Sequence, residues 1–254
     1  MADIRNYWNK RYESGAAASG NFIHSEEANR WFYHAKFRRV RDVLKASRIK
    51  VAGMSVLDAA CGSGAFVPFW LELGAKEVVG TDISDAAVEM CGKAYSNEKS
   101  CRFERVDLTS ESSPIEKESF DLVSIFEAIC LITEEKDFVT ALKNLCSWVK
   151  PGGYLLISDQ LPEVTVPRHE RLKYHSRSIY ENVFRDHGIE IIGLYQQSRV
   201  FTRRIFPPRV QFWVERIFPW VLYVIDRMLL SVPVQSAPFV DEIYYCLARK
   251  RPQA

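Results

Sequence analysis

The chain has 254 residues, with 34 Lys and Arg against 32 Asp and Glu, which gives a formal net charge of +2. With 47% hydrophobic and 26% charged residues, the composition excludes wholesale disorder. The near-neutral charge argues against a dedicated nucleic-acid binder, which would carry a strong basic excess. The length fits one to two domains, and we expect a single domain over residues 1–254.

The cysteines and the apolar runs indicate the compartment. The six cysteines include no CxxC and no paired zinc-ligand spacing, so we expect no metal site. The first residues are charged, unlike an export signal, and the most apolar run, Ile217 to Ile225, is shorter than the about 20 residues of a membrane span. These observations predict a cytoplasmic protein.

Residues 1–50 are expected to form a helical N-terminal lid. Apolar residues recur there at three- and four-residue spacing among arginines and lysines, from Trp31 to Leu44. The small residues 16–20 are expected to form a loop or hinge within the lid.

Residues 51–199 alternate short strand-like runs with helical stretches, which predicts a mostly parallel α/β sheet with helices on both faces. The expected strands are Ser55–Ala59, Glu77–Asp82, Cys101–Val106, Phe120–Phe126, Gly153–Ser158 and Ile189–Gln196. The expected helices are Ala65–Leu73, Ala86–Ser96, Glu135–Val149 and Ser178–His187.

The first strand runs into a glycine-containing turn that ends at Gly62 and Gly64. Such turns let backbone amides approach a ligand at the carboxyl ends of the strands. Asp58 would repel a pyrophosphate there and suits a ligand with a positive group. Val67 stands where a dinucleotide-binding turn has its third glycine, which also disfavours a dinucleotide.

Two further acids follow the next strands. Asp82 ends the second strand candidate, about 20 residues after the turn, where a carboxylate can accept hydrogen bonds from both ribose hydroxyls. Asp107 and Leu108 follow the third strand candidate and combine a polar group with an apolar side chain suited to an adenine. The three strand ends together predict a site for an adenine, a ribose and a positive group.

With these motifs the chain resembles the class I S-adenosylmethionine-dependent methyltransferases over about residues 50–200. The resemblance is carried by VLDAACGSG (56–64), VVGTDIS (78–84), RVDL (105–108), FDLVSIFEAI (120–129) and KPGGYLLISD (150–159). It implies a Rossmann-like, doubly wound seven-stranded sheet of order 3-2-1-4-5-7-6 with an antiparallel last strand, Glu242–Arg249, within residues 241–250. It also implies S-adenosylmethionine as cofactor and S-adenosylhomocysteine as product.

The resemblance assigns cofactor contacts to particular residues. Asp58, Gly62 and Gly64 would surround the methionine part, with Ala60 in place of a commoner glycine, and Asp82 would hold the ribose. The remaining implied contacts are the adenine neighbours Ile83, Asp107 and Leu108, the methionine neighbour Phe126, and Tyr12 from an N-terminal helix that folds over the cofactor.

Methyl transfer from a sulfonium is an in-line displacement, so much of the catalysis can come from positioning. Relatives with small acceptors carry a histidine after the fourth strand, but Leu131 occupies that position here. The nearest candidates for a base or an acceptor anchor are Glu127, Asp159 and His175. For each of them, a purely structural role is the alternative.

Residues 200–240 form an aromatic and basic insertion before the last strand, with an apolar stripe interrupted at Pro219. Three interpretations are open: helices packed on the flank or on a dimer face, a cover over an acceptor pocket, or an amphipathic element on anionic lipid.

We expect a methyltransferase that acts on an oxygen or nitrogen of a bulky apolar or glycosylated small molecule, as in natural product biosynthesis, and not on nucleic acid. The alternatives are a catalytically silent cofactor-binding scaffold and a nicotinamide-dependent oxidoreductase on the same fold. A homodimer and a weak membrane-surface contact through residues 200–230 stay open.

Overall fold

The computed structural model describes residues 2–14, 26–198, 213, 219–231 and 243–252. The predicted hinge at 16–20 and most of the insertion, residues 200–212, 214–218 and 232–240, lie outside the described residues. The helices are α1 (Ala2–Glu13), α2 (Glu26–Ala46), α3 (Val67–Glu72), α4 (Asp85–Ala94), the short η1 (Ile129–Leu131), α5 (Glu135–Trp148), α6 (Arg177–Asp186) and α8 (Pro219–Ser231). The strands are β1 (Ser55–Ala59), β2 (Glu77–Asp82), β3 (Cys101–Arg105), β4 (Phe120–Phe126), β5 (Val149–Asp159), β6 (Val166–His169), β7 (Leu172–Tyr174), β8 (Ile189–Gln196) and β9 (Tyr244–Lys250).

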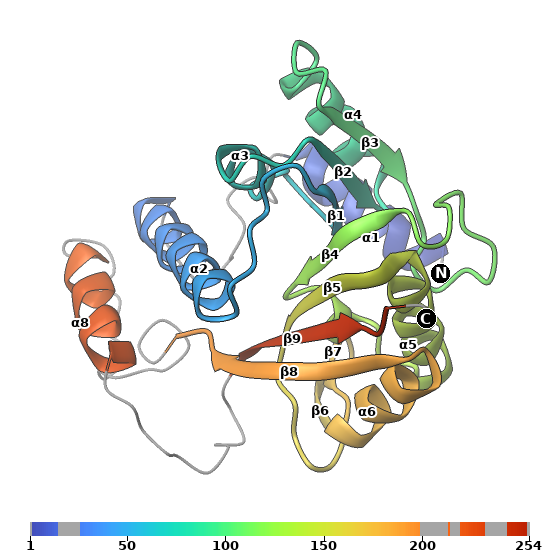
Figure 1. The fold of residues 1–254 in the computed structure, drawn as a ribbon. Coiled ribbons are helices and arrows are strands. Elements are labelled where there is room, and N and C mark those ends of the chain that lie inside the picture. The colour runs from blue at the N-terminus through green and yellow to red at the C-terminus, as the bar shows by residue number, and fades with distance from the viewer. Residues whose placement is uncertain (1, 15–25, 199–212, 214–218, 232–242, 253–254) are drawn as a thin grey trace.

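The main sheet has seven strands in the order β3-β2-β1-β4-β5-β9-β8 (Figure 1). The pairs from β3 to β5 are parallel, and β9 runs antiparallel between β5 and β8. Because β8 and β9 are the sixth and seventh strands of this sheet, the expected order 3-2-1-4-5-7-6 with an antiparallel last strand is confirmed.

Each face of the sheet packs against its own hydrophobic core. Alternate residues of β1 divide between the cores, since Leu57 belongs to the core beneath α5 and α6 and Val56 to the core beneath α2 and α3. Asp58 lies two residues after Val56, so its side chain is on the α2 and α3 face. Ser124 pairs with Asp58 in the neighbouring strand β4 and lies on the same face.

The observed elements include a hairpin that was not expected. Residues 166–174 form the two-stranded hairpin β6-β7, which the sequence pattern did not indicate because the segment is rich in charged residues. Pro219, where the apolar stripe was expected to be interrupted, is the first residue of α8; proline fits the first turn of a helix, where its missing N–H costs nothing.

The helices α1 and α2 come from the predicted lid, and α2 lies beside α8 (Figure 1). Phe32 and Leu222 are buried between α2 and α8, and Trp31 packs on Tyr223 with ring centroids 5.4 Å apart. Within the described part of the chain, no helix has both the length and the hydropathy that a bilayer span requires.

Candidate active site

The turn after β1 is held in an unusual backbone conformation. Ala60, Gly62 and Gly64 have φ values of 53°, 56° and 73°, in the left-handed region that favours glycine. The Cys61 amide donates to the Thr81 carbonyl at 2.8 Å, which ties the turn to the end of β2. The turn therefore lies between the ends of two strands, where backbone groups can approach a ligand.

Asp58 is buried at the end of β1, with only 2% of its surface exposed. Its Oδ1 accepts a hydrogen bond from Ser124 Oγ at 3.0 Å. Burial raises the pKa of Asp58 to about 7; the Ser124 hydrogen bond opposes this rise and the nearby Asp82 adds to it. A positive group on a ligand would lower the free energy that is needed to ionise this buried carboxyl group.

Asp82, at the end of β2, organises the turn. Its Oδ2 accepts from the Gly62 amide at 3.0 Å, and its Oδ1 accepts from the Ser84 amide at 2.9 Å. Burial raises the pKa of Asp82, although these amides favour the ionised form. Because each carboxylate oxygen can accept two hydrogen bonds, capacity remains for ribose hydroxyls.

The predicted adenine-side residues lie near Asp82. The Val106 amide donates to the Asp82 carbonyl at 2.9 Å, which brings the residues after β3 to the same edge of the sheet. Asp107 Oδ1 accepts from the amide and the hydroxyl of Thr109 at 2.9 and 2.7 Å. Leu108 packs against the core, and Ile83 follows Asp82 in a half-buried position.

Helix α1 packs onto this turn. A Cβ on Gly62 would lie 2.6 Å from the Tyr12 hydroxyl, so Tyr12 closely covers the turn. Burial raises the pKa of Tyr12, and the nearby Asp82 adds to the effect. Asn9 accepts from Ser84 Oγ at 2.7 Å, and Arg5 pairs with Asp85 at 2.5 Å. The helix is thus fixed to the start of α4 by polar contacts.

Glu127, directly after β4, has a φ of 52° and connects three segments. Its Oε2 pairs with Lys36 Nζ of α2 at 2.5 Å, and its Oε1 accepts from Gln197 Nε2, just after β8. Lys36 also lies over the rings of Phe32 and Tyr33, at 4.4 and 5.0 Å from their centroids. These contacts fix Glu127 at the base of the lid.

The sequence analysis did not single out Lys36 or Gln197 for the site. A signal existed for Lys36, because it falls on the apolar stripe of the predicted helix, four residues after Phe32, where a charge needs a partner. Tyr33 lies near the same groups: burial raises its pKa, and Glu127 and Asp58 are close enough to contribute.

Phe126, Asp159 and His175 make contacts typical of structural residues. Phe126 stacks on Phe66 with ring centroids 4.0 Å apart, inside the aromatic core beneath α3. Asp159 accepts from the Tyr180 hydroxyl and from the Gln160 amide, and burial raises its pKa to about 7. The methionine contact of Phe126 and the catalytic role of Asp159 stay predictions.

His175 is fully buried between η1 and α5. Its Nε2 donates to the Ile132 carbonyl at 3.0 Å, and its ring stacks on Phe138 at 3.9 Å. Burial lowers the pKa of His175. A buried imidazole that stacks on a core phenylalanine is typical of a structural residue, and the catalytic role of His175 stays a prediction.

Residues 57–157 match the family described as "Methyltransferase domain". The chain is 27% identical over 191 residues to phosphoethanolamine N-methyltransferase 1 of Arabidopsis thaliana, covering 75% of this chain and 35% of that protein. It spans about a third of the length of the first curated relatives it matches.

The fold is similar to that of magnesium protoporphyrin IX methyltransferase from Synechocystis, solved with bound S-adenosylmethionine. The TM-score is 0.63 at 16% identity, and the match covers 98% of this chain and 96% of that one. The cyclase SpnF has the same fold, with a TM-score of 0.58 at 17% identity over 85% of this chain and 81% of that one. One architecture therefore occurs in proteins named for different reactions.

Proposed function

We propose that the chain transfers a methyl group from S-adenosylmethionine to a small-molecule acceptor, because residues 57–157 match the family described as "Methyltransferase domain". One observation supports this most directly. Two buried carboxylates, Asp58 and Asp82, lie on either side of a glycine turn at the carboxyl edge of the sheet.

The residues present fit this cofactor. Asp82 would accept hydrogen bonds from the ribose hydroxyls, and Asp58 would face the positively charged methionine part, whose charge compensates a buried carboxylate. Ile83, Asp107 and Leu108 would border the adenine. When bound, S-adenosylmethionine supplies a methyl group on a positively charged sulfur, and Tyr12 would cover the turn beside it.

The acceptor side is formed by α1, α2 and the hairpin β6-β7. Arg171, between β6 and β7, lies over the Tyr7 ring of α1 at 4.3 Å, so the hairpin reaches the lid. Tyr33 and Phe37 of α2 and Phe66, directly before α3, are in ring contact and would provide an apolar wall. These surroundings suit a bulky apolar or glycosylated metabolite, as in natural product biosynthesis.

The catalysis we propose rests on positioning. Glu127 already pairs with Lys36 and Gln197, Asp159 with Tyr180, and His175 with the Ile132 carbonyl. Each of these side chains is therefore already held in place by a contact within the protein. In-line alignment of an oxygen or nitrogen with the methyl group supplies much of the rate without a base.

Calorimetry and a labelled-methyl assay test the proposal together. We expect S-adenosylhomocysteine to bind and NADH not to bind; tight NADH binding without S-adenosylhomocysteine binding would contradict the cofactor assignment. The acceptor panel should include phosphoethanolamine and magnesium protoporphyrin IX, after the names of the relatives, besides apolar and glycosylated phenols and amines. Binding without transfer to any acceptor would favour a silent scaffold.

A further inference from the structure

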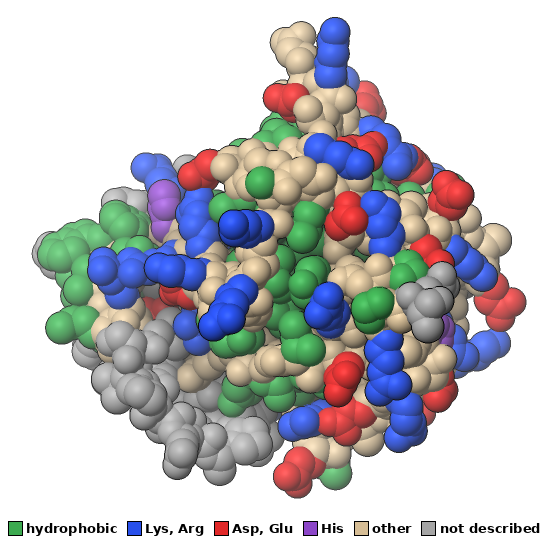
Figure 2. Space-filling view, in the orientation of Figure 1, with side chains coloured by type: hydrophobic (Ala, Val, Ile, Leu, Met, Phe, Trp, Pro, Cys, Tyr) green, Lys and Arg blue, Asp and Glu red, His purple; other side chains and the backbone are tan. Residues whose placement is uncertain are grey.

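Helix α8 presents an apolar stripe to the surroundings. Trp220, Val224 and Met228 follow one another at four-residue spacing and are 49%, 42% and 65% exposed, whereas Leu222 and Asp226 on the opposite side are buried. Figure 2 shows this hydrophobic surface at the left edge of the molecule, beside lysine and arginine side chains. A tryptophan-containing apolar stripe beside basic residues is typical of surfaces that bind a partner or a membrane.

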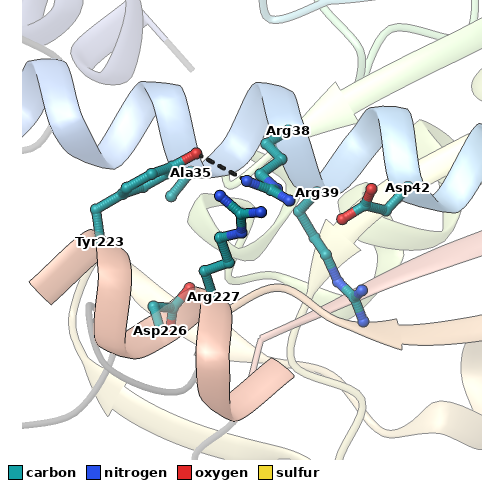
Figure 3. A pocket seen from close by; sticks show the side chains of 7 residues that line it. All are labelled: Ala35, Arg38, Arg39, Asp42, Tyr223, Asp226 and Arg227. Atoms are coloured by element: carbon teal, nitrogen blue, oxygen red, sulfur yellow. Dashed lines mark hydrogen bonds between the residues drawn. The ribbon is translucent and has the colours of Figure 1, made fainter. Parts of the chain in front are cut away.

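A basic pocket of about 230 Å³ adjoins one edge of this stripe, between α2 and α8. Arg38 and Arg227 extend into the same space near the Tyr223 hydroxyl, and Arg38 donates to this hydroxyl at 3.3 Å (Figure 3). The pocket lining has three arginines and two aspartates, Asp42 and Asp226. Asp226 is buried and accepts from Ser198 Oγ at 2.7 Å, so it is directed partly toward the fold.

The pocket and the stripe are joined through one residue. Arg227 is exposed and lines the pocket, and on a helix its side chain neighbours that of Val224, three residues earlier, in the apolar stripe. An apolar surface that enters the acyl boundary would therefore bring the arginines to the depth of the lipid phosphates. Arginine matches the geometry of phosphate oxygens by bidentate hydrogen bonding.

A second copy of this chain fits the same surface less well. Two copies related by a twofold axis through the stripe would bring their Arg227 and Arg38 side chains near one another, which like charges oppose. An anionic bilayer attracts the same groups. The charge at the edge of the stripe therefore favours a lipid surface.

We propose that α8 and the adjoining part of α2 form a docking face for anionic phospholipid bilayers. Trp220, Val224 and Met228 insert at the acyl boundary, and Arg38 and Arg227 bind the phosphate groups of the lipids. This face lies apart from the candidate active site and does not depend on the proposed methyl transfer.

Flotation of the full chain with vesicles tests this docking. We expect binding to vesicles of phosphatidylcholine with phosphatidylglycerol and little binding to phosphatidylcholine alone, with the bound fraction falling as salt is added. Trp220→Ser combined with Met228→Ser should lower the partition coefficient tenfold or more. Arg38→Gln and Arg227→Gln should each lower it about fivefold.

Matched controls are available elsewhere on the surface. Val164→Ser and Arg251→Gln replace residues exposed far from α8 in sequence and should leave vesicle binding unchanged. Calorimetry with S-adenosylhomocysteine should show that all variants retain a folded cofactor site. No binding to anionic vesicles, equal binding to neutral ones, or α8 variants that change only the oligomeric state in sedimentation would overturn the proposal.

Discussion

Lys36 of α2 and Glu127 after β4 form an ion pair, with Nζ 2.5 Å from Oε2, although 91 residues separate them in sequence. The Lys36 side chain is 6% exposed and that of Glu127 is 25% exposed. The pair connects the lid to the strand end that faces the acceptor side.

Breaking this pair should loosen the lid. Glu127→Gln leaves a buried ammonium without its carboxylate, and we expect it to lower the free energy of unfolding by about 1–3 kcal/mol, measured by urea denaturation. Lys36→Met added to it should restore part of the loss. Cofactor affinity should change less than twofold. A fully stable Glu127→Gln variant without turnover would instead indicate direct catalysis.

Asp82 is expected to dominate cofactor affinity. Asp82→Ala removes the acceptor for the ribose and for the Gly62 and Ser84 amides, so the dissociation constant of S-adenosylhomocysteine should rise tenfold or more. Asp107→Ala, whose carboxylate bonds locally to Thr109, should have a smaller effect. Unchanged affinity of Asp82→Ala in calorimetry would show that the ribose assignment is wrong.

Asp58 should make cofactor binding depend on pH. Its pKa is about 7, and only the ionised carboxylate attracts a positive group, so the affinity for S-adenosylmethionine should rise as pH increases through 7. Calorimetry between pH 6 and 8 measures this change. Asp58→Asn should bind more weakly and lose the pH dependence, and a variant that keeps the wild-type profile would contradict the assignment.

The same pKa predicts a change in stability. Between about pH 4 and 7 the folded state keeps a proton on Asp58 that the unfolded state has lost, so the free energy of unfolding decreases as pH rises across this window. Asp58→Asn should therefore be more stable than the native chain at pH 8, with the difference disappearing near pH 4. Thermal unfolding at the two pH values measures it.

The contact of Tyr12 with Gly62 can be tested by a double-variant cycle. Gly62→Ala places a Cβ 2.6 Å from the Tyr12 hydroxyl but 3.8 Å from the ring carbon that bears it, and should displace α1. Tyr12→Phe removes the hydroxyl, so the double variant should recover part of the protection of α1 from proteolysis. Additive effects would show that the two residues do not interact.

Replacing Ala60 by glycine should raise the stability of the protein. A φ of 53° costs a residue with a Cβ about 1–2 kcal/mol, and glycine avoids this strain. Glycine also adds conformational entropy to the unfolded chain, which offsets part of the gain. The net effect of Ala60→Gly should be an increase of up to about 1 kcal/mol in the free energy of unfolding. Ala59→Gly, in regular strand β1, is the control and should destabilise the protein. A lower melting temperature for Ala60→Gly would contradict this account.

Much of the central fold could be predicted because its signals are local. Ser55–Ala59, Glu77–Asp82, Phe120–Phe126 and Ile189–Gln196 are strands with the predicted bounds, since apolar runs end there at turn residues. The grouping of Asp58 and Asp82 followed from strand ends that share one edge of a parallel sheet.

The rest depends on contacts between distant segments. Nothing near Lys36 in sequence indicates that Glu127 is its partner, and the hairpin β6-β7 is stabilised by pairing between charged segments without an apolar pattern. Asp159 is the last residue of β5, and His175 directly follows the hairpin β6-β7. Only the structure shows that their polar atoms already bond to Tyr180 and to the Ile132 carbonyl.

Helix α2 carries Tyr33 and Lys36 toward the candidate active site and Arg38 toward α8 within two turns. A rigid helix cannot move one of these groups without the other. Suppose that a bilayer held α2 in the position that the ion pair of Lys36 and Glu127 requires, and thereby raised the affinity of the active site for its ligand. By thermodynamic reciprocity, ligand binding would then raise the affinity for the membrane by the same factor. The helix would then couple membrane binding to the occupancy of the candidate active site.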